Sequence, residues 1–304
     1  MAGEILQKIA DLKRQRRAII LAHNYQIGEV QDVADFTGDS LGLSIEASRT
    51  DAETIVFCGV RFMAETAAIL SPEKTVLLPE ATAGCPMADM IDAGQLTELR
   101  AKHPDALVVS YVNTTAEVKA LSDYCCTSSN ALELVRRLPV GREIIFVPDR
   151  NLGQYIIDRT GRDMILWPGY CLTHARITDA EIAEARTNYP NAVVMAHPEC
   201  SSEVRACSDE LLSTGGMLKF AAHSAHRQFI VVTEIGILHS LKKANPDKEF
   251  FPASERAACP NMKKINLEKV LWSLQDMRER IVVPDNIRVR ARSALDRMLE
   301  VLPA

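Results

Sequence analysis

The sequence repeats itself three times along its 304 residues, and this repeat restricts the possible folds more than any other feature. An apolar run that ends in polar residues recurs, so that His23, Tyr111 and His197 are separated by steps of 88 and 86 residues. A small hydroxyl residue that opens a helical pattern recurs with the same steps, at Ser40, Ser128 and Thr214. These spacings predict three copies of one structural unit.

Two further landmarks keep the same order in each copy. A β-branched run that leads into a helical pattern occurs at residues 54–60, 143–148 and 228–233. A short apolar run closed by proline and then cysteine occurs at residues 76–87, 165–171 and 250–262. We therefore place the three repeats at residues 1–102 with an N-terminal helix, 103–188, and 189–304 with C-terminal helices.

Strand-like and helix-like segments alternate within each repeat. Helical patterns cover Ser40–Arg49, Arg61–Leu70, Ser128–Leu138 and Gly215–His223, and the runs between them are rich in Val, Ile and Leu. Continuous apolar strands between helices indicate parallel sheets that are buried on both faces. The fold class is therefore α/β, with three strands per repeat. We expect three pseudo-threefold-related, three-layer αβα units with short parallel sheets around a central cavity.

Composition limits the partners of the chain. Apolar residues make up 47% and charged residues 25%, as in ordinary globular proteins, and the net charge is −5. The one dense basic run, Lys13–Arg17, belongs to an amphipathic N-terminal helix, so no nucleic-acid partner is expected. Apolar stretches stay well short of a membrane span, and the N-terminus lacks a signal-peptide pattern, so we expect a cytoplasmic protein without a membrane partner.

Polar residues follow the first strand of each repeat. Ligands of open α/β sheets bind beyond the carboxyl ends of the strands. Under threefold symmetry these ends meet at one cavity, although a single polar residue there often only terminates a strand. The residues expected to face the cavity are His23, Asn24, Tyr25, Tyr111, Asn113, His197 and Glu199.

The hydroxyls of Ser40, Ser128 and Thr214 have two possible roles. A hydroxyl at a helix start normally caps the helix. A helix N-terminus also binds carboxylate or phosphate, so three of them around a cavity predict an anion-binding cage.

Of the eight cysteines, only Cys85, Cys171 and Cys259 recur at the repeat spacing. Three convergent thiolates suit a soft metal centre. A [4Fe–4S] cluster normally takes four cysteines, so three would leave one iron open to substrate. The other five cysteines are expected to be structural: Cys58, Cys125, Cys126, Cys200 and Cys207.

These motifs together resemble the quinolinate synthase family over essentially the whole chain. The resemblance is carried by HNY at 23–25, GDSL at 38–41, YVN at 111–113, CTSSN at 126–130, HPEC at 197–200, STGGM at 213–217 and the three cysteines. It implies a transferase of de novo NAD biosynthesis that carries a [4Fe–4S] cluster. Such an enzyme condenses iminoaspartate with dihydroxyacetone phosphate to quinolinate, and is functionally linked to L-aspartate oxidase or aspartate dehydrogenase.

The resemblance also implies residue roles. Cys85, Cys171 and Cys259 would be the cluster ligands, with the fourth iron open. The implied substrate contacts are His23, Ser40, Tyr111, Val112, Asn113, Ser128, His197, Pro198, Glu199 and Thr214.

For catalysis we expect Glu199, beside His197 and with Tyr111 opposite, to be the general acid/base, its pKa raised by burial. Tyr25 would assist phosphate loss and isomerisation of the triose. The alternative for Glu199 is a surface ion pair with Arg205.

One departure and two alternatives remain. Longer family members carry a CxxCxxC run at the third ligand, whereas Cys259 stands alone, so no thiol switch is expected. A cluster with one open iron would also suit a hydro-lyase that acts on a hydroxy acid, or a cluster-based sensor. A sensor would normally need an additional partner-binding module.

Overall fold

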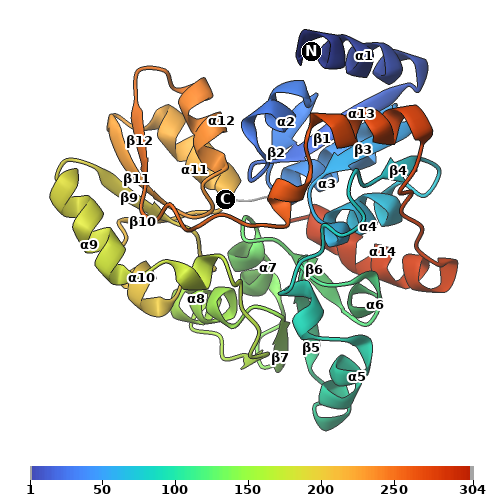
Figure 1. The fold of residues 1–304 in the computed structure, drawn as a ribbon. Helices are drawn as coiled ribbons and strands as arrows, with labels where there is room; N and C mark the ends of the chain where they lie inside the picture. Colours follow the sequence, from blue (N-terminus) through green and yellow to red (C-terminus); the bar gives the residue numbers. More distant parts are fainter. Residues whose placement is uncertain (1, 302–304) are drawn as a thin grey trace.

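The computed structural model describes residues 2–301, which form three four-stranded parallel sheets, one in each repeat (Figure 1). The first sheet has the order β2-β1-β3-β4, and the other two repeat this order as β6-β5-β7-β8 and β10-β9-β11-β12. The three units form three lobes around a common centre (Figure 1). The predicted α/β class with three αβα units is therefore confirmed.

The strands are short. Those of the first sheet are β1 Ala18–His23, β2 Phe36–Gly38, β3 Thr54–Cys58 and β4 Thr75–Leu77. Those of the second are β5 Leu107–Tyr111, β6 Tyr124–Cys126, β7 Ile144–Val147 and β8 Ile165–Leu166. Those of the third are β9 Val193–Ala196, β10 Glu210–Leu211, β11 Gln228–Val232 and β12 Glu249–Pro252.

Each sheet has four strands where the sequence predicted three. The additional strands are β2, β6 and β10, which pair with the first strand of their unit and are only two or three residues long. Segments of this length carry no period that could separate a strand from a loop.

The predicted helices are present with small changes. The bounds of α3 Ser40–Arg49 and α4 Arg61–Leu70 agree with the prediction, and α11 spans Thr214–His223. Helix α7 begins late, at Ala131, because Thr127 donates its backbone N–H to Asn130 Oδ1 at 2.8 Å and holds a turn there.

The remaining helices complete the three layers. They are α1 Ala2–Gln15, α2 Gly28–Val33, α5 Ala93–Lys102, α6 Ala116–Lys119, α7 Ala131–Arg137, α8 Arg150–Thr160, α9 Asp179–Asn188, α10 Ser202–Ala206, α12 Ile237–Ala244, α13 Leu267–Asp276 and α14 Asp285–Leu299. Three 3₁₀ turns lie at Ala88–Met90, His174–Arg176 and Met262–Lys264.

The same hydrogen bonds recur in all three units. An aspartate accepts a backbone N–H of the first strand at 2.8 Å in each: Asp35 from Ile20, Asp123 from Val108 and Asp209 from Val194. Each carboxylate also pairs with a cation on the helix before the first strand of its unit, in the pairs Lys13–Asp35, Arg100–Asp123 and Arg186–Asp209. The repeat is therefore present in the tertiary contacts as well as in the sequence.

The C-terminal helices pack away from the third unit. Helix α13 lies against α1 and β3, and α14 lies against α4, α6 and β6. A shared apolar core joins these helices to the first two units, whereas the third unit has separate apolar clusters. Among the described helices, none combines the length and apolarity that a membrane span requires.

Candidate functional site

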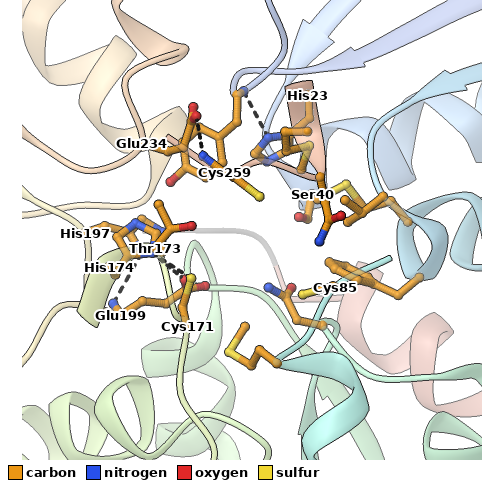
Figure 2. Close-up of a pocket in the computed structure, with 18 of the residues that line it drawn as sticks. His23, Ser40, Cys85, Cys171, Thr173, His174, His197, Glu199, Glu234 and Cys259 are labelled. Atoms are coloured by element: carbon orange, nitrogen blue, oxygen red, sulfur yellow. Dashed lines mark hydrogen bonds and ion pairs between the residues drawn. The ribbon is translucent and has the colours of Figure 1, made fainter. Parts of the chain in front are cut away.

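A cavity lies where the three units meet (Figure 2). The first strand of each unit ends at this cavity, as expected for parallel sheets. The predicted residues that line it are His23, Tyr25, Ser40, Cys85, Tyr111, Asn113, Ser128, Cys171, His197, Glu199, Thr214 and Cys259. The fold thus brings most of the predicted site into one place.

Three predicted residues do not line the cavity. Asn24, Val112 and Pro198 each stand between two residues that do. All three are buried behind the wall. Asn24, for example, donates its Nδ2 to Thr214 Oγ1 at 3.1 Å. The expectation that Asn24 faces the cavity is therefore wrong, whereas the substrate contacts of Val112 and Pro198 stay predictions.

The repeat-related cysteines approach the cavity from equivalent loops. Each stands three residues before one of the 3₁₀ turns, and Figure 2 shows all three sulfurs directed toward the same space. The other five cysteines do not line the cavity, and Cys58, Cys125, Cys126 and Cys200 are buried. All eight are free thiols.

The surroundings of these thiols fit an iron–sulfur cluster. Burial raises the pKa of Cys85 to about 12 and that of Cys171 well above its usual range. Backbone N–H groups of Ala88 and Met87 bond to Cys85, and that of His174 bonds to Cys171. Thiolates in such a place require a cation, and N–H groups directed at sulfur are what a cluster ligand uses.

Glu199 lies at the centre of a hydrogen-bonded relay in the cavity wall. Its Oε1 accepts from Tyr111 Oη at 2.5 Å, and its Oε2 lies 2.9 Å from His174 Nδ1. The relay continues from His174 Nε2 to Thr233 Oγ1 at 2.8 Å, and from Thr233 to Tyr25 Oη at 2.6 Å. Side chains of all three units are therefore joined through one buried carboxylate.

The charge on Glu199 differs from the prediction. Burial acts to raise its pKa, but the contact with His174 and the hydrogen bond from the Tyr111 hydroxyl outweigh burial and hold the pKa below its usual range. The ion pair with Arg205 is not formed, because Arg205 Nη2 lies 3.6 Å from Asp158 instead. Glu199 is thus an ionised carboxylate that can accept a proton.

Two histidines and two tyrosines of the wall keep fixed protonation states near neutral pH. Burial lowers the pKa of both His23 and His197 to about 3, so both rings are uncharged. Burial and the charge of Glu199 raise the pKa of Tyr25 and of Tyr111 well above the usual range. The two tyrosines therefore act as hydrogen-bond donors and not as bases.

The predicted hydroxyls do not cap their helices: neighbouring side chains cap α3 and α11, and no side chain caps α7. Asp39 caps α3 through Gly42 N, and Ser213 caps α11 through Gly216 N at 3.1 Å. Ser128 lies within 3.2 Å of His197 Nε2, and Thr214 accepts from Asn24. These hydroxyls face the cavity, whereas Asp39 places a carboxylate at one of the helix starts.

Sequence reasoning missed two important residues of the wall, His174 and Glu234. His174 stacks on His197 with ring centroids 4.9 Å apart, and its Nδ1 also lies 3.2 Å from Cys171 Sγ. Glu234 accepts the backbone N–H of Cys259 at 2.9 Å and pairs with Lys263 at the same distance. The only sequence signal for His174 was its place three residues after Cys171, where the other repeats carry Ala88 and Met262.

Comparison with known proteins matches this site to one family. The family model described as quinolinate synthetase A protein matches residues 7–300. The chain is 55% identical over 298 residues to the quinolinate synthase of Dehalococcoides mccartyi strain CBDB1, and 53% identical to that of Geotalea uraniireducens, with 98% of each chain covered. It is 52% identical over 299 residues to quinolinate synthase 1 of Methanosarcina acetivorans, again with 98% of each chain covered. With its three thiols and its buried carboxylate in one cavity, the chain belongs to the quinolinate synthase family.

Proposed function

We propose that Cys85, Cys171 and Cys259 hold a [4Fe–4S] cluster with one open iron, and that the cavity around it forms quinolinate. Enzymes of this family are iron–sulfur enzymes of NAD biosynthesis that condense iminoaspartate with dihydroxyacetone phosphate and release phosphate and water. The observation that carries the proposal is that the three repeat-equivalent thiols and the Glu199 relay share one cavity. When bound, the open iron supplies a Lewis acid for a hydroxyl or carboxylate of the substrate.

The proposed substrate contacts come from all three units. Both substrates are anions, so their oxygen atoms need hydrogen-bond donors in a cavity that excludes water. The hydroxyls of Ser40, Ser128 and Thr214 offer these donors, one from each unit. The side chains of His23, Tyr111, Asn113 and His197 complete the proposed contact set. Asn113 Oδ1 is buried without a partner and is free to accept an N–H of the substrate.

Glu199 and Tyr25 are the proposed proton-handling groups. Enolisation of the triose removes a proton from carbon, and the ionised Glu199 is the acceptor that the wall offers. Tyr25 keeps its proton, so it can donate to the phosphate oxygen as the phosphate leaves. Thr233 and His174 connect the two groups and can return a proton from Glu199 to Tyr25.

The proposal has a cellular context. A cluster held by three thiolates needs a reducing compartment, and the eight free thiols suit the cytoplasm. Iminoaspartate must come from an enzyme that oxidises aspartate, which is the proposed link to L-aspartate oxidase or aspartate dehydrogenase. The proposed repeats at 1–102, 103–188 and 189–304 would each contribute one cluster ligand.

Anaerobic purification with iron and sulfide analysis tests the proposal. We expect about four irons per chain, and quinolinate formation from the two substrates. Cys85→Ser and Cys259→Ser should each abolish the cluster, whereas the exposed Cys207→Ser should keep it.

A rival metal site is available for comparison. Cys171, His174 and Glu199 each place one donor atom within 4.8 Å of the others. One metal ion per chain that survives both Cys85→Ser and Cys259→Ser would identify this mononuclear site and overturn the cluster.

A further inference from the structure

A buried ion pair lies beside the candidate cluster ligand of the third unit. Glu234 is completely buried and lines the cavity next to Cys259 (Figure 2). Its Oε1 accepts the backbone N–H of Cys259 at 2.9 Å and lies 2.9 Å from Lys263 Nζ. Its Oε2 accepts the backbone N–H of Gly236 at 2.7 Å. One carboxylate therefore holds both the loop after β11 and the loop that carries Cys259.

Lys263 extends this link to the first unit. Its Nζ donates to the backbone carbonyl of Tyr25 at 2.6 Å. The carbonyl of Gly236 also accepts from Gln31 Nε2 of the first unit, at 2.9 Å. The ion pair thus lies at the boundary between two units, with the loop of Cys259 on one side and the backbone of Tyr25 on the other.

Gly236 leaves just enough space for the pair. A Cβ at this position would lie 2.7 Å from Lys263 Nζ, 2.7 Å from the Tyr25 carbonyl oxygen and 2.8 Å from Glu234 Oε2. The backbone of Gly236 has φ −60° and ψ −26°, which other residues adopt readily, so its conformation does not require glycine. Glycine is required because a side chain here would push the three groups apart.

The other two units do without such a pair. Neither the carboxylate nor the cation recurs at the repeat spacing, since the equivalent residues are Val60 and Pro148 for the carboxylate, and Asp89 and Ala175 for the cation. A shared apolar core joins the first two units, whereas the third unit has separate apolar clusters. The third unit is therefore the one whose ligand loop needs polar contacts to fix it against the first.

We propose that the ion pair of Glu234 and Lys263 anchors the cluster ligand Cys259 to the first unit, and so determines how tightly the chain holds its cluster. This inference rests on the proposed function. Cys85 belongs to the first unit and Cys259 to the third, so both can bind one cluster only while the two loops keep a fixed separation. A buried ion pair gains little stability over an apolar pair of similar volume, so the gain here is the placement of Cys259.

The double variant Glu234→Leu with Lys263→Met tests the anchor, because it removes both charges and leaves neither unpaired. The measurement is the rate at which a ferrous-iron chelator bleaches the optical absorption of the anaerobically loaded protein. Loss of a contact that orients a metal ligand costs about 10–100-fold in metal affinity, so release should be faster by about the same factor. An unchanged release rate would overturn the inference. If the double variant does not fold, Glu234→Gln decides in the same way, because it keeps the size of the side chain and removes the charge that holds Lys263.

Lys269→Met is the matched control. Lys269 also pairs with a glutamate, Glu80 at 2.6 Å, and donates to a backbone carbonyl, that of Lys264 at 2.8 Å, but neither partner of this pair lines the cavity. This variant should keep the wild-type release rate although its stability falls. An equal acceleration there would mean that release follows stability alone, and would also overturn the inference. A wild-type chain without any cluster would instead refute the proposed function.

Discussion

Glu199 lies 2.9 Å from His174 and is the proposed proton acceptor of the site. Glu199→Gln keeps the size of the side chain and removes the proton acceptor. Turnover should fall by about two to four decades, while the optical spectrum and iron content of the cluster stay unchanged. The measurement is quinolinate formation under anaerobic conditions. Near wild-type turnover would remove Glu199 from the mechanism.

Variants of the cavity hydroxyls distinguish a role in substrate binding from a role in stability. Thr214→Ala and Ser128→Ala each remove a hydroxyl that faces the cavity, so each should weaken substrate binding by about 1.5–3 kcal/mol. That is about one to two decades in affinity for dihydroxyacetone phosphate, measured by calorimetry.

Ser213→Ala is the matched control for Thr214. Ser213 caps α11, so its loss should lower the free energy of unfolding by about 1 kcal/mol. Binding should be much less affected. If Thr214→Ala lowers the free energy of unfolding and leaves the affinity unchanged, the hydroxyl has a structural role and does not bind substrate.

Single site residues could be predicted from the sequence where they recur at the same position in all three repeats. Cys85, Cys171 and Cys259 were found because three copies share them. His174 was missed because only the second repeat carries it. The state of Glu199 could not be predicted either, because the partners that lower its pKa come from other parts of the chain.

At the scale of elements, one aspartate per unit links the first strand to the loop that leads into the second strand. Asp123→Ala leaves the backbone N–H of Val108 without its acceptor and Arg100 without its partner. The free energy of unfolding should fall by about 1–3 kcal/mol, measured by urea denaturation. Asp123→Asn keeps an acceptor oxygen and should cost less. The exposed Asp105→Ala should stay within about 0.5 kcal/mol of wild type, and an equal loss there would contradict the assignment.

Helices and long strands were predictable from their periods, but the shortest strands were not. The patterns of α3 and α4 are full helical turns with a buried face, and their bounds agree with the structure. Strand β10 has only two residues, Glu210 and Leu211, and it exists because β9 offers it a backbone edge. Such a strand is decided by tertiary pairing and not by its own sequence.

At the scale of the whole molecule, an ion pair helps to hold α13 on the first unit. Lys269 Nζ lies 2.6 Å from Glu80 Oε2 and, together with Thr82, lowers the pKa of Glu80 to about 2. A folded pKa below the unfolded one gives stability that is present above the unfolded value. That stability is lost as the pH falls toward the folded value.

Glu80→Gln should therefore lower the free energy of unfolding at pH 7 by about 1 kcal/mol. The difference from wild type should shrink as the pH falls from about 4.5 toward about 2. Lys269→Met should cause a similar loss, and the double variant should lose less than the sum. A difference that grows in acid would contradict the ion pair.

Because the three units are covalently joined in one chain, equivalent positions around the cavity can carry different side chains. Three identical subunits around an axis would have to present the same side chain at every equivalent position. Here the position two residues beyond His23, Tyr111 and His197 is Tyr25 in one unit, Asn113 in the next and Glu199 in the third. One chain can thus keep a symmetric set of thiols while it surrounds two dissimilar substrates with three dissimilar walls. A hydroxyl donor, an amide and a proton acceptor thus line one cavity, each from a different unit.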